Sequence, residues 1–490
     1  MHLPEEANIG PGEAVAIIGA ALRFPGASDP SSFHEMTVTG RRMFRALAHR
    51  TDAGNPHDQG DRDQPPVGAP TRLAALLDDA AHGFGRDGNQ AGGTADRRVL
   101  AAETAAAALA DVPLAARAVA AERIGVFIAD IREPGTVDVR DWVSRHLGML
   151  RAGDAAPSRA GDPDVRAHGS GARRPRQIGA GPRTRSRGGP GAVRAHRGGT
   201  GGNGTAVVNG PEPDALHCSL RAVTAACEAL NSGEFDLVLA GGVATGVGDW
   251  THVRAADAPS DDHVRVYDAC PTGSLPGEGC GIVALTRAAD AQAAEVPAYA
   301  EIAGWHYADP ATPERSVLPA AYLRAGIDPA EIQFVEGHGA ATATDDLAEL
   351  SALLEVLGPY GAAGYRCALG SVSANIGDTR AAAGVAALLK TAFAMTADVI
   401  PPSTGCVRPN PLLRGEATPF RLPTAPEQWP QTPIQLAAVN TLGTAAHPDE
   451  PRSGPVHVVL RRERDLTRRP GRRRKPSLLA NIALAVEVSG

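Results

Sequence analysis

The chain has 490 residues, 43% of them hydrophobic, and a formal net charge of −7. This length suggests two to three domain-sized units or one large double domain, and the apolar fraction is typical of a globular protein. The acidic balance gives no global sign of binding to nucleic acid or to acidic membranes, so we predict neither as a partner.

The sequence contains no recognisable export or membrane signal. Residues 1–12 are polar and acidic, and they lack the basic and apolar regions of a signal peptide. No run of about 18 apolar residues is present, so no transmembrane helix is expected. The six cysteines show no CxxC spacing, which predicts reduced thiols, no disulfide framework and no metal site. We therefore expect a cytoplasmic protein.

The first part of the chain predicts alternating strands and helices. Residues 13–19 form a short apolar run that ends in glycine, which predicts a buried strand, and residues 20–26 predict a turn. A helix is expected to begin near Asp29. The alanine-rich segment 98–111 predicts a helix, and residues 123–129 predict a second buried strand.

The pattern then disappears over residues 153–204, where Arg, Gly, Pro and Ala dominate. No acidic residue occurs between Asp164 and Glu212. The composition predicts a disordered or atypical insert. A basic segment of this kind can also bind nucleic acid, but no aromatic residue is interleaved for base stacking. A third hypothesis is a pair of compensating frame errors in the gene, one near Arg151 and one before His217. A GC-rich gene that is translated in the wrong frame gives a sequence rich in Arg, Gly, Pro and Ala.

Regular patterns return in the second part. Apolar positions from Leu220 to Leu230 fall at helical spacing, Gly233 is a candidate C-cap, and residues 235–243 predict a strand. The later elements follow in order: a strand at 282–285, a helix ending at 322–326, a strand at 332–336, a helix at 341–357, a strand at 367–370, a helix at 381–395 with Val385, Leu388, Leu389 and Phe393 on one face, a loop at 401–406, and strands at 435–439 and 456–460. This alternation indicates an α/β protein.

Several segments carry a resemblance to a known family, among them the opening run at residues 13–33. Residues 266–285, VYDACPTGSLPGEGCGIVAL, resemble the loop and strand that begin the second half of a β-ketoacyl synthase. The PTG-x-LPGEGCG motif is most similar to that of iterative type I enzymes of the enediyne class. Residues 336–342 (EGHGAAT) resemble EGHGTGT, and residues 370–378 (GSVSANIGD) resemble GSVKANIGH. The resemblance covers roughly residues 13–129 and 216–460.

The resemblance implies a thiolase-like double domain, an α/β fold with αβαβα layers and two related halves. We place the halves at residues 13–255 and 256–462, followed by a basic tail at 463–490. The implied function is a β-ketoacyl-[acyl-carrier-protein] synthase, which performs a decarboxylative Claisen condensation of acyl and malonyl thioesters in polyketide, antibiotic or fatty-acid-like biosynthesis. The chain itself is expected to bind no cofactor.

The resemblance also implies partners. An acyl carrier protein would present the substrates on its phosphopantetheine arm. A homodimer, or a heterodimer with another ketosynthase, is expected, with residues 235–240 as a candidate dimer strand.

The family uses one cysteine and two histidines. His338 stands at the position of the first histidine, although a lone histidine after a strand can also be structural. Asp378 stands at the second position, and Ser373 replaces the lysine of the motif. A carboxylate beside a developing enolate repels its charge, so Asp378 is not expected to function there. Asp346 and Glu349 resemble an acidic pair of the family.

The position of the nucleophile is open. Counting back from Leu220 without gaps places Leu216 at the family cysteine, and Cys218 lies two residues beyond it. If Asp214 caps the following helix, Cys218 lies one turn inside and is better explained as a small buried apolar residue. Otherwise Cys218 is the candidate nucleophile. His217 is then a neighbour and not its base, because adjacent residues do not share a helix face.

Glycines of the family are also replaced. Ala340 and Ala341 stand where the first histidine motif has Thr and Gly, and the loop at 441–446 has Thr444 for a phenylalanine and alanines for two glycines. Alanine is strained where such glycines take a positive φ. Three functions therefore remain open: an impaired synthase, a non-condensing partner that resembles a chain-length factor, and a decayed pseudo-enzyme.

Overall fold

In the computed structural model, the described residues are 13–46, 73–77, 94–117, 119–130, 143, 218–245, 263–308, 317–361, 366–416, 418–442 and 454–464. The main elements of the first half are β1 (Val15–Arg23), α1 (Pro30–Val38), α2 (Thr94–Asp111), β4 (Ile124–Asp130), α5 (Ser219–Asn231), β5 (Leu237–Ala244), β6 (Gly279–Arg287) and α6 (Ala288–Ala293). Two short strands, β2 (Phe44–Ala46) and β3 (Leu73–Ala75), pair with each other.

The second half contains β7 (Glu301–Tyr307), α7 (Val317–Ala325), β8 (Phe334–Glu336), α8 (Ala343–Gly361), β9 (Cys367–Gly370), α9 (Ser373–Ile376), α10 (Ala383–Ala397), β10 (Val399–Ile400), β11 (Phe420–Arg421), β12 (Glu427–Gln428), β13 (Ile434–Thr441) and β14 (Val456–Glu463). Most of these elements match the runs predicted from the sequence. Strand β7 was not predicted.

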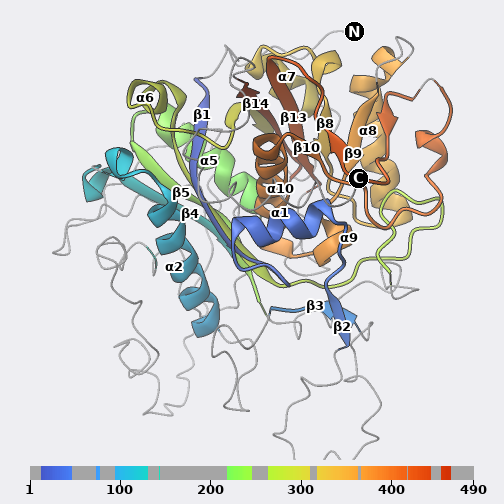
Figure 1. Cartoon of the computed structure of the whole chain (residues 1–490), viewed down its shortest axis with the longest axis horizontal. Helices are drawn as coiled ribbons and strands as arrows, with labels where there is room; N and C mark the ends of the chain where they lie inside the picture. Colours follow the sequence, from blue (N-terminus) through green and yellow to red (C-terminus); the bar gives the residue numbers. More distant parts are fainter. Residues whose placement is uncertain are drawn as a thin grey trace, which may run out of the picture.

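The described strands form one ten-stranded sheet in the order β11-β9-β8-β13-β14-β7-β1-β6-β5-β4 (Figure 1). In the first half, β4 and β5 are parallel, while β5, β6 and β1 are antiparallel neighbours. In the second half, β9, β8 and β13 are parallel, while β13, β14 and β7 are antiparallel neighbours. The two halves meet where Val15 and Ala16 of β1 pair with Ile302 and Glu301 of β7.

The strand order shows that the halves are related. When only β7, β8, β9, β13 and β14 are numbered by chain order, the second half runs from β9 to β7 as third, second, fourth, fifth and first. The described strands β4, β5, β6 and β1 follow the same pattern without the third member. Strand β6, which the predicted boundary at residue 255 assigns to the second half, pairs with β1 and β5 of the first half.

Helices form three layers around the two halves of the sheet. Helices α5 and α10 contact each other, and each contacts strands of both halves; α2 covers β1, β5 and β6, and α7 covers β7 and β14 on the other side with α8 beside it (Figure 1). Strand residues alternate accordingly, since Val15 and Ile17 face the central core whereas Ala16 and Ile18 face α2. The strands therefore lie between two helix layers and are buried on both faces, which explains why their sequences are continuous apolar runs. The predicted αβαβα layering is confirmed.

Helix α10 is buried on every side. Its residues 384–396 are all buried, so the prediction of a single apolar face was wrong. A helix enclosed between two β-layers has no solvent side and is apolar all round. Its one charged side chain, Lys390, forms an ion pair with Glu336 at 2.7 Å.

Strand β1 is longer than predicted. It continues to Arg23, which pairs with Cys280 of β6, so residues 20–23 of the expected turn are strand. Helix α1 begins after Asp29 as expected, because the Asp29 carboxylate accepts a hydrogen bond from the Ser32 backbone N–H at 3.0 Å.

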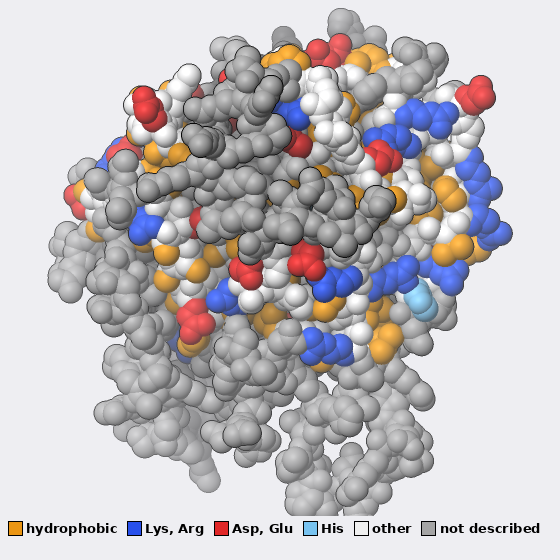
Figure 2. Space-filling view, in the orientation of Figure 1, with side chains coloured by type: hydrophobic (Ala, Val, Ile, Leu, Met, Phe, Trp, Pro, Cys, Tyr) orange, Lys and Arg blue, Asp and Glu red, His pale blue; other side chains and the backbone are white. Residues whose placement is uncertain are grey.

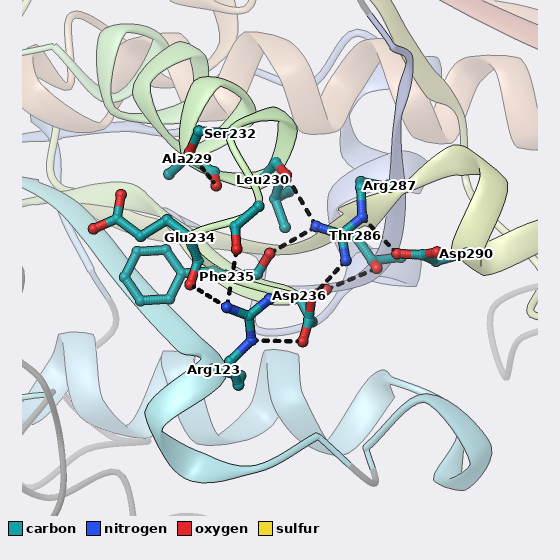
Figure 3. Close-up of polar contacts among 11 residues, drawn as sticks. Arg123, Ala229, Leu230, Ser232, Glu234, Phe235, Asp236, Thr286, Arg287 and Asp290 are labelled. Carbon is teal, nitrogen blue, oxygen red and sulfur yellow. Dashed lines mark hydrogen bonds and ion pairs between the residues drawn. The ribbon is translucent and has the colours of Figure 1, made fainter.

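The C-terminal end of α5 is fixed by the charged side chains of Arg123, Asp236 and Arg287 (Figure 3). The Arg123 guanidinium donates two hydrogen bonds to the Asp236 carboxylate, at 2.8 and 2.7 Å, and two more to the carbonyls of Gly233 and Glu234. Arg287 donates to Asp236 and to the Leu230 carbonyl. Gly233 lies just beyond the C-cap at a φ of 76°, where glycine is favoured.

A bilayer-spanning helix would need to be longer and more apolar than any that occurs among the residues placed by the structure.

Candidate active site

His338 lies on the loop that follows β8. Its backbone N–H donates a hydrogen bond to Glu349 Oε1 at 2.7 Å, and the Gly339 N–H donates to Glu349 Oε2 at 2.9 Å. Glu349 belongs to α8 and is fully buried. His338 itself is partly exposed. The loop is therefore fixed through its backbone while the histidine remains accessible.

The acidic pair predicted from the sequence supports this loop. Glu349 also accepts hydrogen bonds from the Tyr267 hydroxyl at 2.9 Å and the Asn440 amide at 2.8 Å. Asp346 accepts hydrogen bonds from the backbone N–H groups of Tyr267 and Ala341. Burial raises the pKa of Asp346 to about 8. These carboxylates act as backbone anchors, and they connect the histidine loop with the signature loop that begins at residue 266.

Ala341 is strained. It takes a φ of 57°, in the left-handed region that costs a non-glycine residue roughly 1–2 kcal/mol. This is the position at which the resembled motif has glycine. The side chain is fully buried, and the Gly273 N–H donates to its carbonyl at 2.8 Å. The turn geometry is kept although the residue that favours it has been lost.

Asp378 lies just after α9 on a well-anchored loop. Its Oδ1 accepts a hydrogen bond from the Arg380 backbone N–H at 2.7 Å. Its own N–H donates to the Leu275 carbonyl, and its carbonyl accepts from the Gly277 N–H. Gly377 before it takes a φ of 73°. The loop is thus tied to the signature loop, and a carboxylate stands where the resembled motif has a histidine.

Cys218 is the N-cap of α5, with φ −126° and ψ 123°. The prediction that it lies one turn inside the helix was wrong, because α5 begins at Ser219; Asp214 and His217 are outside the described residues. Burial raises the pKa of the Cys218 thiol, while hydrogen bonds from the Arg221 and Leu220 backbone N–H groups and from Thr441, and the charge of Arg221, act to lower it. Cys218 is 1% exposed.

The contacts bring Cys218 and His338 to the ends of two neighbouring strands, β13 and β8. Val439 of β13 pairs in parallel with Glu336 of β8, so Thr441, the last residue of β13, and His338, two residues beyond β8, lie at neighbouring strand ends. Thr441 is also the residue whose side chain bonds Cys218. In the part of the chain that the structure places, no hydrogen bond or ion pair directly joins the side chains of Cys218, His338 and Asp378.

The start of α5 also packs against the start of α10. The Val385 N–H donates to the Ser219 hydroxyl at 2.8 Å, and a Cβ atom added to Gly384 would lie 2.7 Å from the Leu220 backbone nitrogen. Because α10 begins only five residues after Asp378, these contacts place the N-terminus of α5 near the loop of Asp378. The pairing depends on close approach at glycine.

Sequence reasoning missed the supporting hydrogen bonds of several residues in this site. The hydroxyls of Ser371 and Ser373 both donate to the His338 carbonyl, at 2.8 and 3.0 Å. Tyr267 reaches Glu349 across 82 positions of sequence. No spacing in the sequence indicates that these serine and tyrosine side chains make such bonds, so only the three-dimensional arrangement identifies the bonds.

Some sequence predictions fall on parts of the chain that the structure does not describe. These parts are the insert at 153–204, residues 443–450 with Thr444, and residues 465–490 of the tail. Strand β5, the candidate dimer strand, pairs with β4 and β6 on its two edges, so it has no free edge for a partner strand. No group of three or more His, Cys, Asp or Glu side chains suited to a metal ion is found among the described residues.

Two family models match the sequence. The model described as "Beta-ketoacyl synthase, N-terminal domain" matches residues 12–140 and 218–291, and the model described as "Beta-ketoacyl synthase, C-terminal domain" matches residues 300–406. Together they match more than half of the chain. The first match ends after β6 and therefore follows the grouping of strands in the sheet.

Large synthases are among the similar curated proteins. A phthioceranic/hydroxyphthioceranic acid synthase of Mycobacterium bovis is 34% identical over 249 residues, which cover 47% of this chain and 11% of that protein. The highly reducing polyketide synthase sorA of Penicillium rubens is 30% identical over 242 residues, which cover 47% of this chain and 9% of that protein. The chain thus spans only a small part of the length of these relatives.

Solved ketosynthase structures share the fold. A ketosynthase from module 6 of the bacillaene synthase of Bacillus subtilis 168 matches with a TM-score of 0.67 at 22% identity, covering 92% of this chain and 72% of that one. An oxazolomycin ketosynthase domain of Streptomyces albus JA3453 matches with a TM-score of 0.64 at 21% identity, covering 94% and 76%.

Proposed function

Because this chain belongs to the β-ketoacyl synthase family, as a ketosynthase domain of the polyketide synthase type, we propose that it accepts acyl groups on Cys218 and condenses them with malonyl units at an impaired rate. The observation that carries this proposal is the position of Cys218. It caps α5, and its thiol bonds Thr441 at the strand end beside the one that precedes His338.

The first step would be acyl transfer to Cys218. The thiolate attacks the carbonyl carbon of an acyl thioester, a new C–S bond forms, and the carrier thiol leaves with the proton that the cysteine has lost. The backbone N–H groups of Leu220 and Arg221 and the charge of Arg221 act to lower the pKa of this thiol, which favours its negative charge. Burial acts in the opposite direction and raises the pKa of the thiol. Acylation is therefore expected to be slow near neutral pH.

The second step would be condensation. A malonyl thioester loses CO₂, and the resulting enolate attacks the acyl carbon on Cys218, which breaks the thioester bond and restores the thiolate. The enolate oxygen needs hydrogen-bond donors. His338 can supply one, whereas the Asp378 carboxylate repels the developing charge. Loss of a single donor of this kind typically costs on the order of 10²–10³ in rate, which is why we propose impaired activity.

An acyl carrier protein is the proposed partner. Arg41, Arg408 and Arg414 are exposed. Arg41 lies next to α9, because the Asn375 side chain donates to the Arg41 carbonyl, and Asn375 also donates to Thr404 of the loop that leads to Arg408. Figure 2 shows Lys and Arg side chains gathered toward one side of the face that it draws. A basic border of this kind favours an acidic partner. Replacing all three arginines with glutamate should slow acyl transfer from the carrier while leaving transfer from a small acyl thioester unchanged.

Acylation of Cys218 tests the proposed function. We would incubate the full chain with a small acyl thioester and measure its intact mass and then its peptides. One acyl group on Cys218, absent in Cys218→Ala and kept in Cys227→Ala, supports the proposal. Cys227 is the matched control because it lies on the same helix and is fully buried. An unmodified wild-type chain, or equal labelling of the Cys218→Ala variant, would reject it.

A non-condensing role is the second candidate, and Asp378 is the observation that favours it. A non-condensing partner subunit needs the fold and an interface, but it does not need a second hydrogen-bond donor to the enolate at the position of Asp378. Sedimentation of the chain alone and with an intact ketosynthase would decide. A stable complex without acylation of Cys218 supports this role, and a monomer in both mixtures counts against it.

A further inference from the structure

The backbone carbonyl of His338 receives two side-chain hydrogen bonds. Ser371 Oγ donates at 2.8 Å and Ser373 Oγ at 3.0 Å. Ser371 Oγ in turn accepts a hydrogen bond from the Ser373 N–H at 3.3 Å. The two serines and the histidine carbonyl therefore form one small network, in which both hydroxyl protons are used.

The remaining polar groups of the histidine loop are also fixed. The N–H groups of His338 and Gly339 donate to Glu349, and the Gly337 N–H donates to the Gly370 carbonyl at 2.8 Å. The peptide groups on both sides of the His338 Cα atom are therefore held from α8 on one side and by the serines on the other. Because both peptide groups are fixed, the direction of the Cα–Cβ bond is fixed as well.

Ser373 differs from Ser371 in its position. It is the first residue of α9, and its carbonyl accepts a hydrogen bond from the N–H of Gly377, the residue before Asp378. Helix α9 is anchored further at Asn375, whose carbonyl accepts from the Met43 N–H at 2.8 Å. The Ser373 hydroxyl thus connects this anchored turn, which leads to Asp378, directly with the histidine loop.

We propose that Ser373 is a positioning residue for His338. Its hydroxyl holds the histidine carbonyl, and so sets the direction in which the imidazole is presented and couples the loop of Asp378 to the loop of His338. A lysine in its place, as in the resembled motif, would bring a charge but not this short bond. Asp378 is then the one ionisable side chain of residues 371–378. The catalytic part of this inference rests on the proposed function, whereas the positioning part does not.

Ring resonances of histidine provide a test that is independent of catalysis. We would label the 15 histidines, assign the His338 ring signal by its loss in His338→Gln, and compare three further variants. Ser373→Ala removes the bond, Ser373→Thr keeps a hydroxyl, and Ser351→Ala is the matched control. Ser351 donates to the Leu347 carbonyl at 2.6 Å on the exposed side of α8.

We expect the His338 signal to move in Ser373→Ala, to return in Ser373→Thr, and to stay in place in Ser351→Ala, with equal melting temperatures. Condensation by Ser373→Ala should fall about fivefold in kcat with KM little changed, as for the loss of one hydrogen bond of about 1 kcal/mol. An unmoved signal in Ser373→Ala, or an equal shift in Ser351→Ala, would overturn the inference. If the signal moves as expected and no variant condenses, the positioning role stands and the proposed function fails.

Discussion

The backbone N–H of His338 donates to the carboxylate of Glu349 at 2.7 Å, and this bond joins the candidate catalytic loop to α8. Glu349 accepts from three other groups as well and is fully buried. Glu349→Gln would replace one oxygen with an amide NH₂, and the two groups that donate to that oxygen would lose their acceptor. We expect the free energy of unfolding to fall by about 2 kcal/mol, measured by urea denaturation. Glu355→Gln, on the exposed side of the same helix, should change it by less than about 0.5 kcal/mol; equal effects would contradict the anchoring role.

Ala341 at a φ of 57° provides a second prediction. Ala341→Gly relieves the left-handed strain at the cost of one buried methyl group and some entropy. We expect a net gain in stability of about 0.5–1 kcal/mol. Ala352→Gly, inside α8 where the backbone is helical, should instead lose about 1 kcal/mol. Thermal unfolding of both variants measures the difference, and a loss in both would show that Ala341 is not strained.

Asp236 predicts an acid-sensitive contribution to stability. Its hydrogen bonds with Arg123 lower its pKa to about 2 from an ordinary value of 3.8. A lowered pKa gives stability that is present above pH 4 and lost as the pH falls toward 2. Since a third of the side chain is exposed, we expect Asp236→Asn to cost only about 1 kcal/mol at pH 7. Urea denaturation at pH 7 and near pH 2 should show this difference and then its disappearance; a constant difference would contradict the assignment.

Asp346 should make the free energy of unfolding depend on pH in the opposite direction. Burial raises its pKa to about 8, so the folded protein holds a proton that the unfolded chain releases above pH 4. Its contribution to stability is therefore full below pH 4 and decreases as the pH rises from 4 to 8. Asp346→Asn keeps an acceptor oxygen for only one of the Tyr267 and Ala341 N–H groups, so it should lower the stability overall, and it should flatten the stability profile over this window. A profile as steep as that of the wild type would show that another group titrates.

Much of the fold could be predicted because its strands are apolar on both faces. Short continuous runs such as residues 123–129 identified strands, and the motif around His338 placed the histidine on a strand end. Strand β7 was missed because its sequence, EIAGWHY, mixes charged, small and aromatic residues. The all-round burial of α10 follows from the layer that it occupies, which periodicity within one helix does not reveal.

The candidate site was predicted only in part, because its supporting bonds join residues that are distant in sequence. Cys218 was placed inside a helix on the assumption that Asp214 is the cap, whereas α5 begins at Ser219. The strain at Ala341 depends on its φ, which the sequence indicated only through comparison with a glycine motif.

The frame-error hypothesis for the middle of the chain stays a prediction. Resequencing the gene across the codons from Arg151 to Leu220 would test it. If the hypothesis holds, another reading frame encodes an amino-acid sequence that resembles a ketosynthase before α5.

The most direct test of impaired condensation is the rate of Asp378→His. Condensation of a small acyl thioester with a malonyl thioester would be followed for the wild type, Asp378→His and Asp378→Asn. We predict that Asp378→His is at least about 100-fold faster than the wild type, and that Asp378→Asn, which only removes the repelling charge, lies between them. If Asp378→His condenses no faster than the wild type, the carboxylate is not what limits this domain, and the proposed cause of its impairment is contradicted.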